Sequence, residues 1–164
     1  MLQETPPYPN AQANTLRIIL LALMAGPALF CIIAVFSGPT VPPDEQEAMI
    51  ALALRGAWLF LTITGVAAIM IFPAMVARQH RKNHPEEAEP GHAAVGAFLS
   101  SSVIGAAMLE APAILIGVVI LLYGSPVDLL LAVIPLIIMS TLLRIEPRWQ
   151  GFVRLIRESH AGTP

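Results

Sequence analysis

Four long stretches with almost no charged residue constrain the fold of this chain more than any other feature. Residues 18–37 and 56–77 carry no charge, and each has the length of about 20 residues that a helix needs to cross the hydrocarbon core of a bilayer. The third stretch, residues 93–123, contains Glu110 as its only charged residue, and the fourth, residues 129–143, is the shortest. The sequence predicts membrane-spanning helices at about residues 16–37, 53–77, 95–123 and 127–143, with a membrane-buried re-entrant segment as the alternative for the last of them.

The composition supports this interpretation. Apolar residues make up 56% of the 164 residues and charged residues only 12%, whereas soluble domains carry about 25% charged residues. The net charge of −2 argues against nucleic acid as a partner, and the single cysteine excludes an intrachain disulfide. We therefore predict an all-α fold in which residues 1–164 form one membrane domain, a four-helix bundle of two hairpins with the lipid bilayer as its solvent.

The distribution of basic residues predicts the orientation, because cytoplasmic loops carry an excess of Lys and Arg. One side of the predicted membrane domain holds eight of the nine basic residues, and the other side holds only Arg55. We therefore expect both termini to be cytoplasmic and the protein to lie in the inner, cytoplasmic membrane. The eight residues are Arg17, Arg78, Arg81, Lys82, Arg144, Arg148, Arg154 and Arg157.

The C-terminal segment has the pattern of a short amphipathic helix. Trp149, Phe152, Val153 and Ile156 recur at helical spacing, with arginines between them. This pattern is typical of a helix that lies on an anionic membrane surface. We predict such an interfacial helix at residues 147–158.

Glu110 is the first candidate for a functional residue. It falls near the middle of the third predicted span, where an ionised carboxylate is costly, and no Lys or Arg lies within any apolar run. We expect a carboxyl that is neutral much of the time. Its helical neighbours are mostly small, which favours close approach of another helix from this chain or from a second copy. The predicted packing face consists of Ala106, Ala107, Ala113 and Gly117.

Pro112 adds a possible partner for this carboxyl. A proline inside a helix lacks an N–H and leaves the carbonyl four residues earlier without its donor, which here is the carbonyl of Met108. That carbonyl lies within one turn of Glu110, and we expect it to accept its proton. The candidate ion or proton site therefore consists of Glu110, Met108 and Pro112. A neutral carboxyl that locks the helices together and a group that handles an ion both remain open.

The sequence contains no catalytic motif. A nucleophile elbow, a P-loop, a dinucleotide fingerprint and a zinc motif are all missing. His80 and His84 are four residues apart, but Pro85 disfavours a shared helix face at that point. We therefore predict no catalytic residue, no metal and no cofactor.

Residues 77–122 resemble the hairpin of the rotary ATP synthase proteolipid, subunit c. The resemblance rests on Ala77-Arg78-Gln79, a polar loop, and Glu110-Ala111 followed by a run of Val, Ile and Leu. It implies that Glu110 carries a proton or sodium ion, and that Arg78 and Gln79 belong to the cytoplasmic loop. His80 stands where that family has proline, and the loop is longer. The chain as a whole resembles small four-helix bacterial membrane proteins to which no function is assigned.

Three functions follow as hypotheses. The first is a non-enzymatic membrane protein that associates with itself or with other membrane subunits and keeps Glu110 as a buried neutral carboxyl. The second is a proton- or cation-handling membrane subunit that uses Glu110. The third, and the least favoured, is a small membrane enzyme, because one carboxylate and scattered hydroxyls do not make a convergent site.

Overall fold

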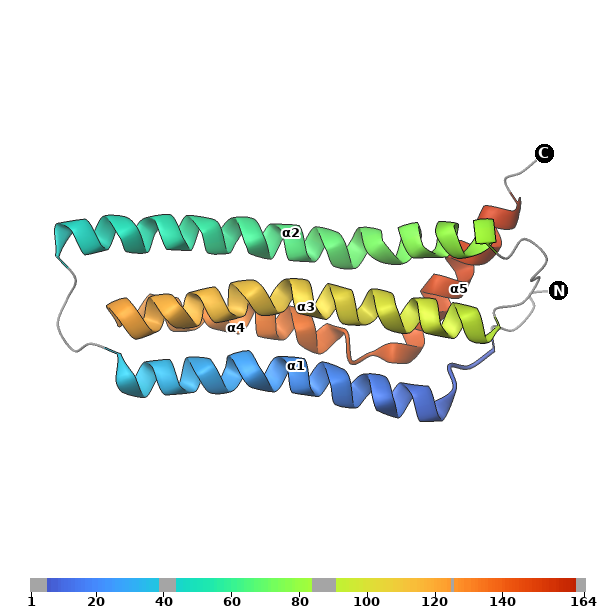
Figure 1. Cartoon of the computed structure of the whole chain (residues 1–164), viewed down its shortest axis with the longest axis horizontal. Coiled ribbons are helices and arrows are strands. Elements are labelled where there is room, and N and C mark those ends of the chain that lie inside the picture. Colours follow the sequence, from blue (N-terminus) through green and yellow to red (C-terminus); the bar gives the residue numbers. More distant parts are fainter. Residues whose placement is uncertain (1–5, 39–43, 84–90, 125, 162–164) are drawn as a thin grey trace.

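A computed structural model of the chain describes residues 6–38, 44–83, 91–124 and 126–161, and within these ranges it consists of helices without a strand (Figure 1). The all-α prediction is confirmed. The five helices are α1 (Asn10–Ser37), α2 (Glu45–Asn83), α3 (His92–Tyr123), α4 (Pro126–Thr141) and α5 (Ile145–Ala161).

Three of these helices are long and apolar enough to cross a membrane. They are α1, α2 and α3, with 28, 39 and 32 residues. The 16 residues of α4 extend over only about 24 Å, short of the roughly 30 Å of hydrocarbon. It reaches the required length only together with α5, across a bend of 65°. The structure therefore supports three to four membrane-spanning segments.

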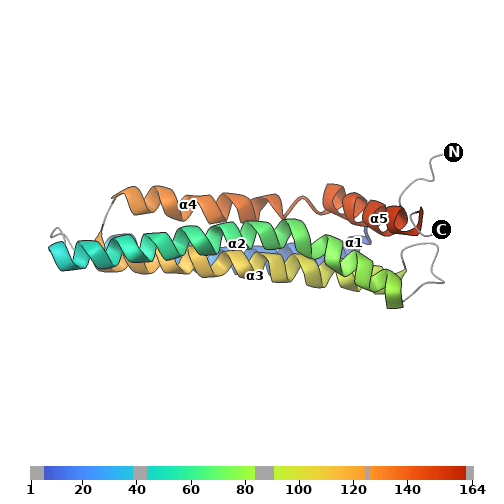
Figure 2. The ribbon, with the colours of Figure 1, turned by 90° about the horizontal axis from the view of Figure 1, so that it is seen from above.

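The helices form two layers. In Figure 1, α3 lies between α1 and α2, and Figure 2 shows α4 and α5 on one side of this three-helix layer. Fourteen residues of α3 are buried, more than in α1 or α2. The central helix is therefore α3, and it contacts α1, α2 and α4.

Glycines let the helices approach α3 closely. A Cβ atom built on Gly65 of α2 would lie 2.7 Å from Leu109 Cδ2 and 3.1 Å from the carbonyl oxygen of Met108. A Cβ atom on Gly117 of α3 would lie 2.7 Å from the ring of Phe30 in α1. Neither position has room for a methyl group, so these two glycines set the distances between α3 and its neighbours.

Local signals define several helix ends. Asp44 and Glu47 form a capping box at the start of α2: the Glu47 N–H donates to Asp44 Oδ1 at 2.8 Å, and the Asp44 N–H donates to Glu47 Oε2 at 3.1 Å. Gly124 ends α3 in the left-handed conformation, with φ of 61°, and its N–H donates to the Ile120 carbonyl at 2.8 Å. This conformation favours glycine, and it allows the chain to turn directly into α4.

The apolar face of α5 is buried within the protein. Trp149, Phe152, Val153 and Ile156 are each at most 5% exposed. Trp149 packs edge-on against Tyr8 and also packs against Phe98 of α3. The apolar face predicted for this helix therefore packs against the helix bundle in this structure. The position of the segment 147–158 relative to a lipid surface stays a prediction.

The residues before α1 complete this cluster. The indole N–H of Trp149 donates to the Pro6 carbonyl at 2.9 Å, and the backbone N–H of Tyr8 donates to Glu146 Oε2 at 3.3 Å. Tyr8 is 3% exposed, and burial raises the pKa of its phenol, which keeps the group neutral. Pro6–Pro9 and α5 are therefore held together at one end of the bundle.

Replacing Gly65 by alanine tests the close contact between α2 and α3. We expect Gly65→Ala to lower the unfolding temperature in detergent by roughly 2–12 °C, because the new methyl group meets Leu109 and the Met108 backbone, and overpacking costs about 1–3 kcal/mol. Gly56→Ala, also in α2, is the matched control, since a Cβ atom there meets nothing within 4 Å. Equal stability of the two variants would contradict this account of the α2–α3 contact.

Candidate functional site

Glu110 lies in the middle of α3, on the flank that faces α1. The side chain is half-buried, and its Oε1 atom is 3.9 Å from where a Cβ atom on Gly26 would stand. Gly26 itself is exposed, so the carboxyl occupies a niche that exists because α1 has no side chain there. Among the residues that the structure describes, no hydrogen bond or ion pair reaches this carboxyl.

The carbonyl of Met108 lies on a different side of α3. It faces Gly65 of α2, as its distance of 3.1 Å from a Cβ atom there shows, whereas Glu110 faces α1. Residues two apart are separated by about 200° around a helix axis, which explains the divergence. Pro112 is buried. The structure therefore does not bring the freed carbonyl and the Glu110 carboxyl together.

The four small residues of the predicted packing face also lie on different sides of α3. Ala106, Ala113 and Gly117 are buried, with Gly117 against Phe30 of α1. Ala107 is exposed. Three of the four small residues thus face other parts of this chain, and Ala107 lies on an open surface beside Glu110.

A second ionisable site connects α2 with α4, and the sequence analysis missed it. Arg55 Nε donates to Asp128 Oδ1 at 2.7 Å, and its Nη2 donates to Asp128 Oδ2 at 2.8 Å. Asp128 is fully buried, while the Arg55 side chain is 31% exposed. From the sequence, Arg55 was noted only as the single basic residue on its side of the predicted membrane domain.

The geometry of this pair makes it a strong interaction. The two parallel hydrogen bonds follow the planar shape of the guanidinium group, and charge-assisted bonds of this kind are about twice as strong as neutral ones. Asp128 also lies in the first turn of α4, where the helix dipole stabilises a negative charge. The pair therefore neutralises both charges and fixes α4 to α2.

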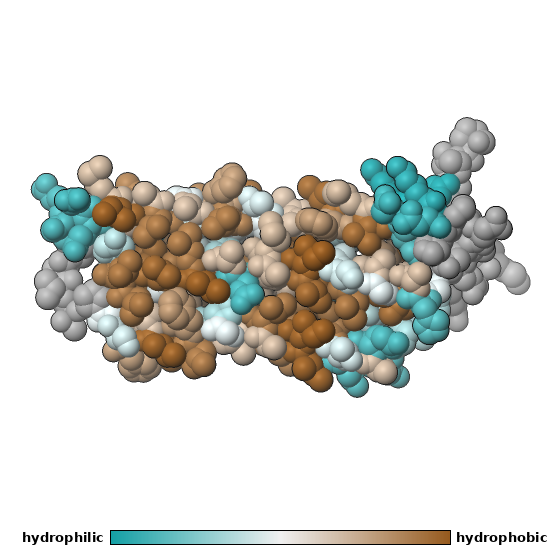
Figure 3. All heavy atoms as spheres, viewed as in Figure 1, coloured by the Kyte–Doolittle hydropathy of each residue, from teal (hydrophilic) through white to brown (hydrophobic). Residues whose placement is uncertain are grey.

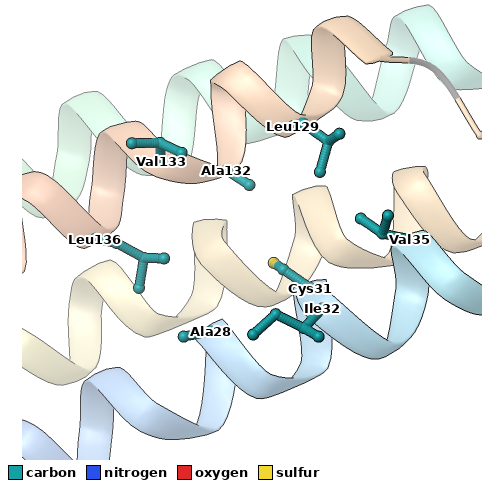
Figure 4. Close-up of a pocket in the computed structure, with 8 residues that line it drawn as sticks. All are labelled: Ala28, Cys31, Ile32, Val35, Leu129, Ala132, Val133 and Leu136. Carbon is teal, nitrogen blue, oxygen red and sulfur yellow. The ribbon is translucent and has the colours of Figure 1, made fainter.

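An apolar cavity of about 250 Å³ lies between α1 and α4 (Figure 4). Its lining contains no polar side chain other than the thiol of Cys31, which is used in a 3.6 Å contact to the Ala113 carbonyl. Small-molecule sites combine apolar walls with convergent polar groups, and this cavity lacks the latter. The lining residues are Ala28, Cys31, Ile32, Val35, Leu129, Ala132, Val133 and Leu136.

Nothing in the described ranges assembles a metal site. No three His, Cys, Asp or Glu side chains there lie close enough to share an ion. Of the histidine pair considered from the sequence, His80 is buried near the end of α2, and His84 lies outside the described residues. Glu110 and the Arg55–Asp128 pair are therefore the groups whose chemistry remains to be explained.

Comparisons with protein-family models, with curated proteins and with solved structures found no match.

Separate replacement of the two charged partners tests the α2–α4 link. We expect Arg55→Met to cost about 3–5 kcal/mol, because it leaves the fully buried Asp128 without a partner. Asp128→Asn should cost less, about 1–3 kcal/mol, because the partly exposed Arg55 can turn toward water and the amide keeps one hydrogen bond. Unfolding in detergent, followed by tryptophan fluorescence, measures both.

The double variant Arg55→Met, Asp128→Leu is the control for this pair. It removes both charges, so it should recover part of the stability that Arg55→Met loses. A double variant at least as unstable as Arg55→Met would show that the guanidinium group contributes by packing rather than by pairing with Asp128.

Proposed function

We propose that this chain is a non-enzymatic, multi-pass integral membrane protein in which Glu110 serves as a neutral, hydrogen-bonding carboxyl within the membrane. The observation that carries the proposal is the place of that carboxyl. It lies half-buried in the middle of an apolar 32-residue helix, against Gly26, with no cation beside it in the described part of the chain. Because charged groups at this depth are costly, a neutral form is favoured.

The surface supports the membrane assignment. Figure 3 shows mostly apolar side chains over the middle of one face, interrupted by one hydrophilic group, with the other hydrophilic groups concentrated toward the two ends. Large apolar residues are exposed along the helices, including Phe36 at 86%, Met49 at 74% and Phe60 at 70%. Soluble monomers rarely expose such extensive apolar surface, so lipid is the natural solvent for these residues.

The proposed topology has four spans, with both termini cytoplasmic in the inner membrane. The excess of Lys and Arg on one side supports this orientation. The hydrogen bond from the Trp149 indole to the Pro6 carbonyl supports the placement of both termini on one side. It requires the segment before α1 and the segment after α4 to lie on the same side. In this arrangement the fourth crossing is made by α4 together with the beginning of α5, across the bend of 65°.

One observation favours the alternative function, proton or cation handling. The niche that holds the Glu110 carboxyl is bordered by the exposed Gly26, so the carboxyl can be reached from outside the bundle. A titrating carboxyl needs such access. The two functions differ in whether Glu110 changes its protonation state in the working range of pH.

Labelling with a lipid-soluble carbodiimide separates them, because this reagent attacks protonated carboxyls in apolar surroundings. If Glu110 is neutral throughout, its labelling in membranes, read by mass spectrometry, should not change between about pH 6 and pH 9 or on addition of sodium. Labelling that fades as the pH rises, or that sodium blocks, would overturn the proposal in favour of ion handling.

Two further measurements control this experiment. Glu110→Gln should abolish the labelled peptide while leaving expression and unfolding temperature unchanged, because an amide can replace a neutral carboxyl in hydrogen bonding. Glu47, exposed in the first turn of α2, lies in a polar region and reports the reactivity of an ordinary carboxylate under the same conditions.

A further inference from the structure

One side of the three-helix layer has no covering helix in the part of the chain that the structure describes. Figures 1 and 2 show α4 and α5 on one side of the layer formed by α1, α3 and α2, and nothing but this layer on the other. A set of exposed residues on α3 marks the open side: they repeat every three or four positions and so form one helix face. They include Gly96, Ser100, Ile104, Ala107, Ala111 and Ile114.

The seam between α1 and α3 lies on this open side. Ala28 and Cys31 of α1 line the cavity with α4. Gly26 is about 200° from Ala28 around the helix axis, so it lies on the flank directed away from α4. Exposed Ala22 shares that flank with Gly26. The Glu110 carboxyl, in contact range of Gly26, therefore lies at the surface of the layer that α4 does not cover.

This surface needs a partner that can form hydrogen bonds. The acyl chains of a lipid offer no donor or acceptor, and an unsatisfied polar group in hydrocarbon costs several kcal/mol. The chain itself offers Glu110 no partner among the described residues. A neutral carboxyl has one donor and one acceptor, so it is complementary to a second neutral carboxyl.

A second copy of the chain presents that group at the right depth. All copies insert with the same orientation, so a dimer in the membrane has its two-fold axis along the bilayer normal. In such an isologous contact each residue near the axis meets its own counterpart. Gly26 and Ala107 border Glu110 and are both small and exposed, which allows the two helix layers to approach.

We propose that a second copy of this chain packs on the α1–α3 seam, with the two Glu110 carboxyls hydrogen-bonded to each other across a two-fold axis along the membrane normal. This inference rests on the proposed function, because it requires Glu110 to be neutral. It adds the partner, the contact surface and the group that the carboxyl binds.

Disulfide cross-linking in reconstituted vesicles tests the contact surface. In a Cys31→Ser background, which removes the only cysteine, Ala107→Cys should form covalent dimers when an oxidant is added. Ser140→Cys is the matched control: both positions are exposed, on opposite layers, and lie about 24 Å and 21 Å from the α3–α4 turn. Vesicles of purified protein contain no other membrane protein, so a dimer there is a contact between copies.

Variants of Glu110 and Gly26 test the carboxyl pair and the seam. Fluorescence energy transfer between labelled copies, diluted in lipid, should show that Glu110→Leu raises the dissociation constant roughly tenfold, as expected for the loss of two interhelical hydrogen bonds. Glu110→Gln should stay near the wild-type value, because two amides pair in the same way. Gly26→Leu should also abolish cross-linking at Ala107, because its side chain fills the seam.

Each contrary outcome identifies what has failed. Equal cross-linking at Ala107→Cys and Ser140→Cys, or none at Ala107→Cys in folded protein, would overturn the contact surface. Unchanged association of Glu110→Leu would overturn the carboxyl pair. Neither result affects the pH independence of carbodiimide labelling, so the proposed function would stand or fall by that separate measurement.

Discussion

The close packing of α3 against α1 and α2 is the contact on which the other features of the structure depend. In lipid, apolar side chains gain nothing by leaving the solvent, so helices associate through van der Waals packing and interhelical hydrogen bonds. Gly65 and Gly117 permit that packing, because a methyl group at either position would overlap the neighbouring helix. With α3 fixed in the middle, Gly124 turns the chain into α4 on one side, and Glu110 is placed against Gly26 at the margin of the other.

The Arg55–Asp128 pair explains how the shortest helix is held. Since α4 has 16 residues and touches α1 and α3 over part of its length, packing alone gives it a limited contact. The bidentate bond to Arg55 adds a link to α2 that also gives the fully buried Asp128 an opposite charge as its partner. A charge count along the sequence treats such residues as independent, because 73 residues separate them. In the fold, however, the two charges are in direct contact.

The helices could be predicted from the sequence wherever an apolar run is long enough to be surrounded by lipid. An uncharged run of about 20 residues in lipid must satisfy its N–H and C=O groups internally, which leaves the helix as the only choice for an isolated segment. The residues that pack against each helix face were harder to predict. The pattern of Trp149 and Phe152 showed that one side of α5 is apolar, but Tyr8 and Phe98 supply its packing partners, and no spacing in the sequence connects these segments. The small residues near Glu110 indicated a close helix without saying that Gly26 lies in it.

The two carboxyl groups of the apolar region illustrate two solutions to one problem. Asp128 has no exposure, and its cost of burial is offset by a guanidinium group with matching geometry. Glu110 has no cation in reach within the described residues, and the neutral form that we propose for it avoids the cost of a charge in hydrocarbon. Protonation leaves a donor and an acceptor that still require partners. Because α1 presents a glycine and α3 an exposed alanine beside this group, the described side chains leave the Glu110 carboxyl partly uncovered, and the proposed second copy would cover it.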